Sequence, residues 1–159
     1  GLRRSQILAL QWKDCDFTNH TISINKSIVR SKHREFHRGK ERRIRIIPIP
    51  EIVEDRLLAW KKEQAEKLLL RGKQQTLDTL ICSTVRAIPM ERTYLDKLFR
   101  KFINESSLPP QLRFHDLRWS YINHELKRQP LKIVSETVGH SSCVYTMDYY
   151  VESKASQFA

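Results

Sequence analysis

The sequence lacks the features that would send a chain into or across a membrane. Across its 159 residues, no apolar run approaches the ~18 residues that a membrane-spanning helix needs. The first residues, GLRRSQILALQW, contain no long apolar core followed by a small-residue cleavage site, so no secretory signal is predicted. Internal repeats and low-complexity segments are also missing. The length then predicts one domain with a core of its own.

Cysteine is scarce, and its pattern excludes a disulfide framework. The chain has three cysteines, Cys15, Cys82 and Cys143, which are odd in number and far apart in the sequence. Small disulfide-stapled domains carry even numbers of closely spaced cysteines instead. The sequence therefore favours buried thiols in a reducing compartment.

Acidic residues are few relative to basic ones. Lys and Arg number 29 against 18 for Asp and Glu, which gives a net charge of +11 and a pI near 9.8. Such an excess favours a polyanionic partner, because each neutralised phosphate releases condensed counterions. A basic soluble domain without that partner would show the same balance, so residues with specific chemistry have to decide.

The residues with informative spacing lie in segment 114–150, FHDLRWSYINHELKRQPLKIVSETVGHSSCVYTMDYY. His115 and Arg118 are three apart, so on a helix they lie on one face and can reach the same ligand atom. A Gly-His pair follows at 139–140, and Tyr150 comes ten residues after its histidine. Cleaving a phosphodiester without water or metal requires a nucleophile, cations, an acid and a base, and these residue types can supply them.

The order H-x-x-R, then G-H, then Tyr at a short fixed distance resembles the tyrosine recombinase (phage integrase) family. The family's upstream Gly-x-Arg motif is present at the start of the chain as Gly1, Leu2 and Arg3. The resemblance covers essentially the whole chain. Because the motif begins at the first residue, we expect residues 1–159 to be a single C-terminal catalytic domain, a fragment without its N-terminal DNA-binding domain.

The resemblance implies a chemistry and a set of catalytic residues. Family members attack DNA with the tyrosine, form a 3′-phosphotyrosine link and release a 5′-hydroxyl, and a second DNA end reverses the step. Neither ATP nor a metal is consumed, so no cofactor is expected. A guanidinium binds two phosphate oxygens without deprotonating, and histidine titrates near physiological pH. The implied catalytic set is Arg3, Lys40, His115, Arg118, His140 and the nucleophile Tyr150.

Two positions bear further on this assignment, the lysine of the hairpin and the residue three after Arg3. Lys40, the implied acid for the leaving oxygen, lies eight residues before Pro48, and Lys32 and Lys26 compete for the role. The family usually carries an acid three residues after the first arginine, where this chain has Gln6. An amide weakens the contact that orients the arginine, but it still forms hydrogen bonds.

The fold is expected to be mainly α with a small antiparallel β-sheet (α+β). Residues 20–30 and 42–49 alternate apolar and polar side chains as strands do, and the polar turn between them contains Gly39. The two strands are therefore predicted to pair as a hairpin. Its basic residues are predicted to lie along a DNA backbone: Lys26, Arg30, Lys32, Arg34, Arg38, Arg42 and Arg43.

Helical periodicity accounts for most of the remainder. A short helix is predicted at 3–11, with Ile7, Leu8 and Leu10 facing inward, and TLICS at 79–83 reads as a short apolar strand or buried turn. Apolar spacing predicts further helices with core-facing stripes. These stripes are Leu95, Leu98, Phe99, Phe102 and Ile103 in the second of the helices given below, Trp119, Ile122 and Leu126 in the third, and Val144, Met147 and Val151 in the last. Gly72 and Gly139 are predicted as C-terminal caps. These helices span 51–71, 91–106, 115–128, 131–138 and 142–152.

The sequence leaves other functions open. A type IB topoisomerase shares the chemistry but reseals the same strand, and the compact H-x-x-R to Tyr segment argues against it. A DNA-binding module without catalysis and a basic RNA-binding or ribosomal protein predict no such ordered set. His33 and His37 are spaced as a helical metal pair, but no further ligands accompany them. The resemblance implies double-stranded DNA as partner, a homo-tetramer of the full-length protein on DNA, and a prokaryotic cytoplasmic, nucleoid-associated location.

Overall fold

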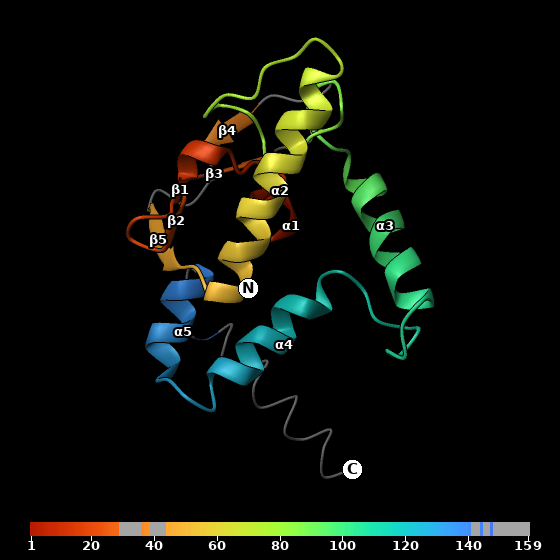
Figure 1. The fold of residues 1–159 in the computed structure, drawn as a ribbon. Coiled ribbons are helices and arrows are strands. Elements are labelled where there is room, and N and C mark those ends of the chain that lie inside the picture. Colours follow the sequence, from red (N-terminus) through yellow and green to blue (C-terminus); the bar gives the residue numbers. More distant parts are fainter. Residues whose placement is uncertain (29–35, 39–43, 141–143, 145–146, 148–159) are drawn as a thin grey trace.

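The computed structural model describes residues 1–28, 36–38, 44–140, 144 and 147, with the backbone alone for 36–38. Helices predominate over a small antiparallel sheet, which confirms the predicted fold class (Figure 1). The helices are α1 (Arg4–Ile7), η1 (Trp12–Asp14, 3-10), α2 (Glu51–Leu69), α3 (Arg92–Asn104), α4 (Asp116–Glu125) and α5 (Leu131–Val138). The strands are β1 (Cys15–Asp16), β2 (Thr21–Ile24), β3 (Lys26–Ile28), β4 (Phe36–Arg38) and β5 (Arg45–Pro48).

The three-stranded sheet has the order β1-β2-β5, and both pairings are antiparallel. In β2, Ile22 and Ile24 are buried while their neighbours are only partly buried, the alternation that a strand with one covered face produces. Ile22 lies opposite Ile47 of β5. The predicted pairing of segments 20–30 and 42–49 is therefore confirmed.

The segment between those strands is more than the turn that the sequence predicted. β3 and β4 pair antiparallel as a second, two-stranded ladder, with Ser27 opposite His37. Phe36 is the one apolar residue in the polar run 31–40, so no period of two was visible there to reveal β4. Gly39 lies outside the described residues.

The larger core lies between the sheet, η1 and α2. Its buried apolar residues are Leu10, Trp12, Ile22, Ile24, Ile49 and Ile81, and Leu57 and Trp60 of α2 pack against them. A buried amide joins these layers, because Trp12 Nε1 donates to Gln64 Oε1 at 2.7 Å and Gln64 Nε2 donates to Leu80 O at 2.9 Å. Buried polar groups need such partners.

The helix predicted at 3–11 is shorter in the structure, where α1 ends at Ile7 and η1 follows. Leu8 and Leu10 are buried as predicted, and Ile7 is partly buried. Segment 79–83 is a buried turn with two isolated bridges, from Leu80 to Gln11 and from Ser83 to Pro89. Beyond the end of α2, Gly72 has a positive φ of 65°, in line with the predicted cap.

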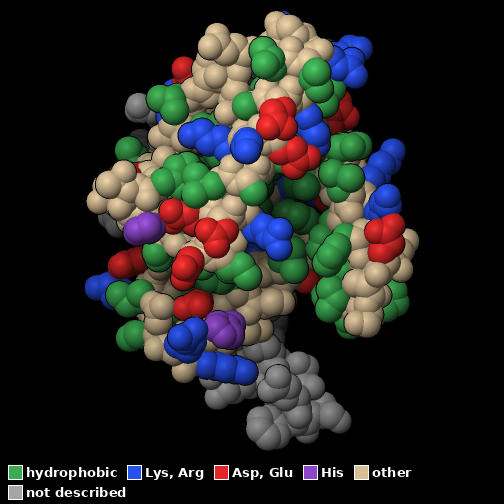
Figure 2. Space-filling view, viewed as in Figure 1, with side chains coloured by type: hydrophobic (Ala, Val, Ile, Leu, Met, Phe, Trp, Pro, Cys, Tyr) green, Lys and Arg blue, Asp and Glu red, His purple; other side chains and the backbone are tan. Residues whose placement is uncertain are grey.

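α3 departs most from its predicted environment. Its apolar stripe was expected to be core, and Ile103 is indeed buried, but Leu98 is 42% exposed and Phe102 57% exposed. Figure 1 shows α3 standing beside α2 and not in the layer that covers the sheet. In Figure 2 a hollow separates it from the main body, and hydrophobic side chains gather on its walls. Periodicity located the helix but could not show how little covers it.

The second core lies between α4 and α5. Ile122, Val134 and Val138 are buried there, and Trp119 and Leu126 pack against them as predicted for α4. Gly139 ends α5 in the left-handed conformation, with φ 72° and ψ 49°, which confirms its predicted role as cap.

Of the last predicted helix, 142–152, the structure describes only Val144 and Met147. Val144 and Met147 are helical there, but 60% and 55% of their surfaces are exposed, so their predicted place in the core is wrong. Val151 lies outside the described residues. Over the part of the chain that the structure covers, no helix combines the length and apolarity needed to cross a membrane.

Candidate active site

Arg3 and Arg118 meet at the C-terminal end of α5. Arg3 Nη2 donates to Gly139 O at 3.2 Å, and Arg118 Nη2 donates to Val138 O at 2.8 Å. Arg118 Nη1 also donates to Gly1 O. The last carbonyl groups of a helix have no hydrogen-bond partner within it, so they carry partial negative charge and attract cations. Arg118 is only 3% exposed, so these backbone contacts fix the orientation of a buried guanidinium.

Gly1 has a steric reason to be glycine. A Cβ built on it would lie 2.4 Å from Cδ1 of Tyr121, one turn below Arg118 on α4. Real Cβ atoms do not approach that closely, so Tyr121 can cover the chain only where no side chain is present. The glycine of the Gly-x-Arg motif thereby allows its own carbonyl to reach Arg118.

The two motif histidines face a common tryptophan. His115 occupies the N-cap of α4, and its ring makes an edge contact with Trp119 at a centroid distance of 6.0 Å. His140 follows the cap of α5, and its ring lies 6.1 Å from the same Trp119 ring. The structure therefore brings together four of the predicted residues: Arg3, His115, Arg118 and His140.

The environment of His115 favours its neutral form. Burial of the ring and the charge of Arg118 both lower its pKa below the ordinary value. Partial removal from water and a neighbouring positive charge both disfavour the protonated, positively charged form of the ring. His115 is thus neutral at pH 7, with one ring nitrogen able to accept a proton and the other able to donate a hydrogen bond.

Gln6 stands where the family usually has an acid, and it makes two contacts through one oxygen. Its Oε1 accepts a hydrogen bond from the backbone N–H of Arg3 at 2.9 Å and from Arg45 Nη2 of β5 at 3.1 Å. Gln6 is 7% exposed, so both bonds are largely shielded from water. The amide therefore joins the first arginine to the sheet through backbone and Arg45.

Lys26, predicted as a DNA contact and as a competitor for the catalytic lysine, is held within the fold. Its Nζ lies 3.0 Å from Asp14 Oδ2 and also donates to Gln11 Oε1, and its side chain is only 16% exposed. The other residues predicted to contact DNA have no described side chain. Lys40, Tyr150, Arg30, Lys32, Arg34, Arg42 and Arg43 lie outside the described residues, as does His33, and Arg38 and His37 are described by backbone alone.

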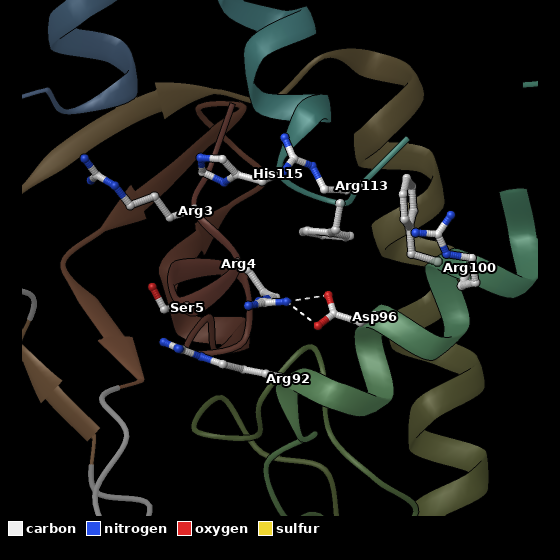
Figure 3. A pocket seen from close by; sticks show the side chains of 10 residues that line it. Arg3, Arg4, Ser5, Arg92, Asp96, Arg100, Arg113 and His115 are labelled. Atoms are coloured by element: carbon white, nitrogen blue, oxygen red, sulfur yellow. Dashed lines mark hydrogen bonds and ion pairs between the residues drawn. The ribbon is translucent and has the colours of Figure 1, made fainter. Parts of the chain in front are cut away.

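A cavity of about 540 Å³ opens beside Arg3 and His115 (Figure 3). Its ten lining residues include five arginines and a single aspartate: Arg3, Arg4, Ser5, Arg92, Asp96, Phe99, Arg100, Arg113, Phe114 and His115. Arg4 Nη1 binds both carboxylate oxygens of Asp96 and so ties α1 to α3. Among the described residues, no group of three or more His, Cys, Asp or Glu side chains is placed to hold a metal ion.

The model of the phage integrase family matches residues 1–156. The chain belongs to this family. The resemblance drawn from the motifs is thereby confirmed.

Relatives within the phage integrase family are bacterial and phage recombinases. The chain is 27% identical over 165 residues to a protein named tyrosine recombinase XerC-like from Caldanaerobacter subterraneus, covering 94% of this chain and 42% of that one. It is 28% identical over 153 residues to the ICEBs1 integrase of Bacillus subtilis, covering 94% and 41%. The chain thus spans less than half the length of these relatives.

Solved structures agree with the integrase fold. The Tn1549 transposon integrase in complex with transposon right-end DNA superposes with a TM-score of 0.73 at 19% identity, covering 93% of this chain and 50% of that one. The XerA recombinase gives a TM-score of 0.71 at 15% identity, with 99% and 53% covered. At these identities the likeness establishes the shared fold.

Two groups of residues around this integrase site escaped the sequence analysis. Trp119 follows His115 by four residues and so shares its helix face, a spacing that was visible but was read as core packing alone. Arg92, Asp96 and Arg100 repeat every four residues on α3, a pattern that indicates one charged face. Arg4 could be found only from the structure, because its partner Asp96 is distant in sequence.

Proposed function

We propose that this chain is the catalytic domain of a site-specific DNA recombinase that cleaves and rejoins DNA strands through a 3′-phosphotyrosine intermediate. The observation that carries the proposal is the meeting of Arg3 and Arg118 at consecutive carbonyls of α5, beside His115 and His140. Two guanidinium forks and two imidazoles at one point suit a phosphate whose charge grows during attack.

The proposed steps conserve bond energy. The phenol oxygen of Tyr150 attacks phosphorus, and the bond from phosphorus to the 5′ oxygen breaks. Lys40 gives its proton to that leaving oxygen, while neutral His115 takes the phenol proton of Tyr150. A 5′-hydroxyl from another DNA end then attacks the phosphotyrosine and returns a proton to Lys40, while His115 returns the phenol proton to Tyr150. This restores the phosphodiester and frees the tyrosine.

Arg3 and Arg118 bind the two non-bridging oxygens during these steps. A guanidinium whose direction is set by backbone carbonyls needs little reorganisation when charge develops, which is how preorganised donors stabilise a transition state. The burial of Arg118 adds to this, because a buried cation gains more from an anionic ligand than an exposed one does.

Double-stranded DNA is the proposed partner. The excess of 29 basic over 18 acidic residues supports it, and so does the Tn1549 relative, whose structure contains transposon DNA. We propose further that residues 1–159 form the catalytic part of a longer protein that acts as a homo-tetramer on DNA in a prokaryotic cytoplasm, in association with the nucleoid. Relatives more than twice as long support the first of these points.

Covalent capture tests the function. A pool of nicked duplexes with randomised sequence is incubated with the protein, denatured in detergent, and assayed for DNA that remains attached. Attached DNA is expected with the unmodified chain and with Tyr149→Phe, and none with Tyr150→Phe. Neighbouring side chains on a helix point about 100° apart, so only one of the two tyrosines is expected to serve. An adduct that survives Tyr150→Phe but not Tyr149→Phe would move the nucleophile, and no adduct in any variant would reject the function.

A further inference from the structure

The cavity beside Arg3 and His115 extends well past those two residues. Three of its lining side chains, Arg92, Asp96 and Arg100, come from successive turns of α3 and share one helix face. Figure 3 shows Arg92 and Arg100 on either side of the ion pair between Arg4 and Asp96, with Arg3 and His115 above and to the left of that pair. The cavity therefore reaches from Arg3 and His115 to the charged face of α3.

The charge of this cavity is strongly one-sided. Five arginines line it against one aspartate. Asp96 binds Arg4, and Asp116, which does not line the cavity, lies 3.2 Å from Arg113, so the charges of these two arginines are matched. Guanidinium groups gathered in one cavity repel one another, and an anion placed between them offsets that repulsion.

Arg92 and Arg100 are held in place by carbonyl oxygens, and no carboxylate among the described residues forms an ion pair with either. Arg92 Nη2 donates to Ile28 O, at the end of β3, at 3.1 Å. Arg100 Nη1 donates to Pro110 O in the loop before α4. A carbonyl oxygen carries no full charge, so these bonds orient the two guanidinium groups and leave their positive charge for a ligand.

The cavity also has an apolar wall. Phe99 of α3 and Phe114 meet edge to face with their ring centroids 5.5 Å apart, and both line the space. A surface that combines arginine forks with an apolar wall fits a nucleotide backbone, in which an uncharged deoxyribose separates consecutive phosphates.

Resting on the proposed function, we propose that this cavity is a second phosphate-binding subsite. It takes the DNA backbone phosphate next to the scissile one, with Arg92 and Arg100 as its anion ligands. The Arg4–Asp96 ion pair fixes the spacing between the two phosphates, because Arg4 directly follows Arg3 and Asp96 lies between the two ligands on α3. The subsite thus sets which phosphate reaches Arg3 and Arg118.

A small probe tests this without a known DNA target. Thymidine 3′,5′-bisphosphate carries two phosphates one nucleotide apart, and thymidine 5′-monophosphate carries one. Titrations at fixed salt are expected to give about tenfold tighter binding or more for the bisphosphate, the effect of one added charge-assisted contact. The Nε–Hε NMR signals of Arg92 and Arg100 should shift with the bisphosphate.

Matched variants separate the subsite from general charge. Arg92→Gln and Arg100→Gln are expected to reduce the preference for the bisphosphate to about threefold or less. Arg71→Gln, which removes the same charge beyond the end of α2 and outside the cavity, should retain it. An undiminished preference in both cavity variants overturns the proposal.

A third probe excludes recognition of the base. The bisphosphate of deoxyribose without its base is expected to bind as tightly as the thymidine compound. A loss of the preference on removing the base would mean that Phe99 and Phe114 hold a nucleobase, and the phosphate subsite would be wrong. These titrations involve no strand cleavage. A failed subsite with a covalent adduct therefore leaves the recombinase function standing, and an absent adduct rejects that function separately.

Discussion

Arg3 and Arg118, which are 115 residues apart in the sequence, donate hydrogen bonds to the carbonyl oxygens of Gly139 and Val138, which are consecutive residues. The position of both guanidinium groups therefore depends on how α5 ends. Gly139 ends it with a φ of 72°, a conformation that costs other L-residues roughly 1–2 kcal/mol. The cap of one short helix sets the spacing of the two arginines.

Gly139→Ala should consequently impair both stability and chemistry. We expect the free energy of unfolding to fall by about 1–2 kcal/mol in urea titrations, and the rate of covalent adduct formation to fall well below the unmodified rate. Gly72→Ala is the matched control, because Gly72 has a φ of 65° and open space around it. It should lose similar stability and keep its adduct rate. Equal loss of activity in both variants would remove the special role of the α5 cap.

The close approach of Gly1 to Tyr121 predicts a pair of compensating substitutions. Gly1→Ala places a methyl group 2.4 Å from the Tyr121 ring, which must push the Gly1 carbonyl away from Arg118 and slow adduct formation. Tyr121→Ala removes the obstacle, so the double variant should react faster than Gly1→Ala alone. Rates for all four proteins form a double-mutant cycle, and additive effects would contradict the steric explanation.

The sequence predicted α4, α5 and the cap at Gly139 well, because each has strong local signals in apolar spacing or in a glycine. It placed Leu98 and Phe102 of α3 in the core and was wrong, since periodicity shows that a helix has an apolar face but not what covers it. At the site, the order of the motifs was enough to predict Arg3, His115, Arg118 and His140. The link between Arg4 and Asp96 joins residues far apart in the chain, so no local pattern reveals it.

Substitutions of Gln6 test whether its amide replaces the acidic residue that the family usually has at this position. Gln6→Leu leaves the Arg3 N–H and the Arg45 guanidinium without their shared acceptor, and should lower the free energy of unfolding by about 1–3 kcal/mol. Gln6→Glu offers a charged acceptor of the same shape to Arg45 and should preserve or raise stability. Urea titrations of the two variants at neutral pH decide this. A Gln6→Leu protein as stable as the unmodified chain would show that the amide contacts matter little.

The lowered pKa of His115 predicts that the rate of adduct formation falls at acidic pH. Burial and Arg118 lower its pKa, so the neutral ring prevails down to a pH below the ordinary value of about 6.5. Adduct formation should fall as the pH decreases through this lowered pKa, because a protonated ring can no longer accept. NMR titration of the His115 ring should show the pKa rising in Arg118→Gln and staying low in Arg118→Lys, which keeps the charge. An unchanged pKa in Arg118→Gln would exclude the influence of Arg118.

The identity of the proton donor is the final prediction, and it separates three lysines. General acid catalysis is worth about 10²–10⁴-fold only when the leaving oxygen needs a proton. DNA in which sulfur replaces the 5′-bridging oxygen removes that need. Lys40→Ala should therefore be severely slow on ordinary DNA and close to the unmodified rate on the sulfur substrate.

The other variants fix the interpretation of that rescue. Arg118→Ala should remain slow on both substrates, because the phosphate charge still needs stabilising. Lys26→Ala should mainly lower stability, since the Lys26 ammonium lies 3.0 Å from Asp14 inside the fold, and sulfur should not rescue it. If Lys40→Ala is equally slow on both substrates, Lys40 anchors phosphate and does not donate the proton. If the rescue appears in Lys32→Ala instead, the count of eight residues back from Pro48 has selected the wrong lysine, and the proton comes from the earlier part of the hairpin.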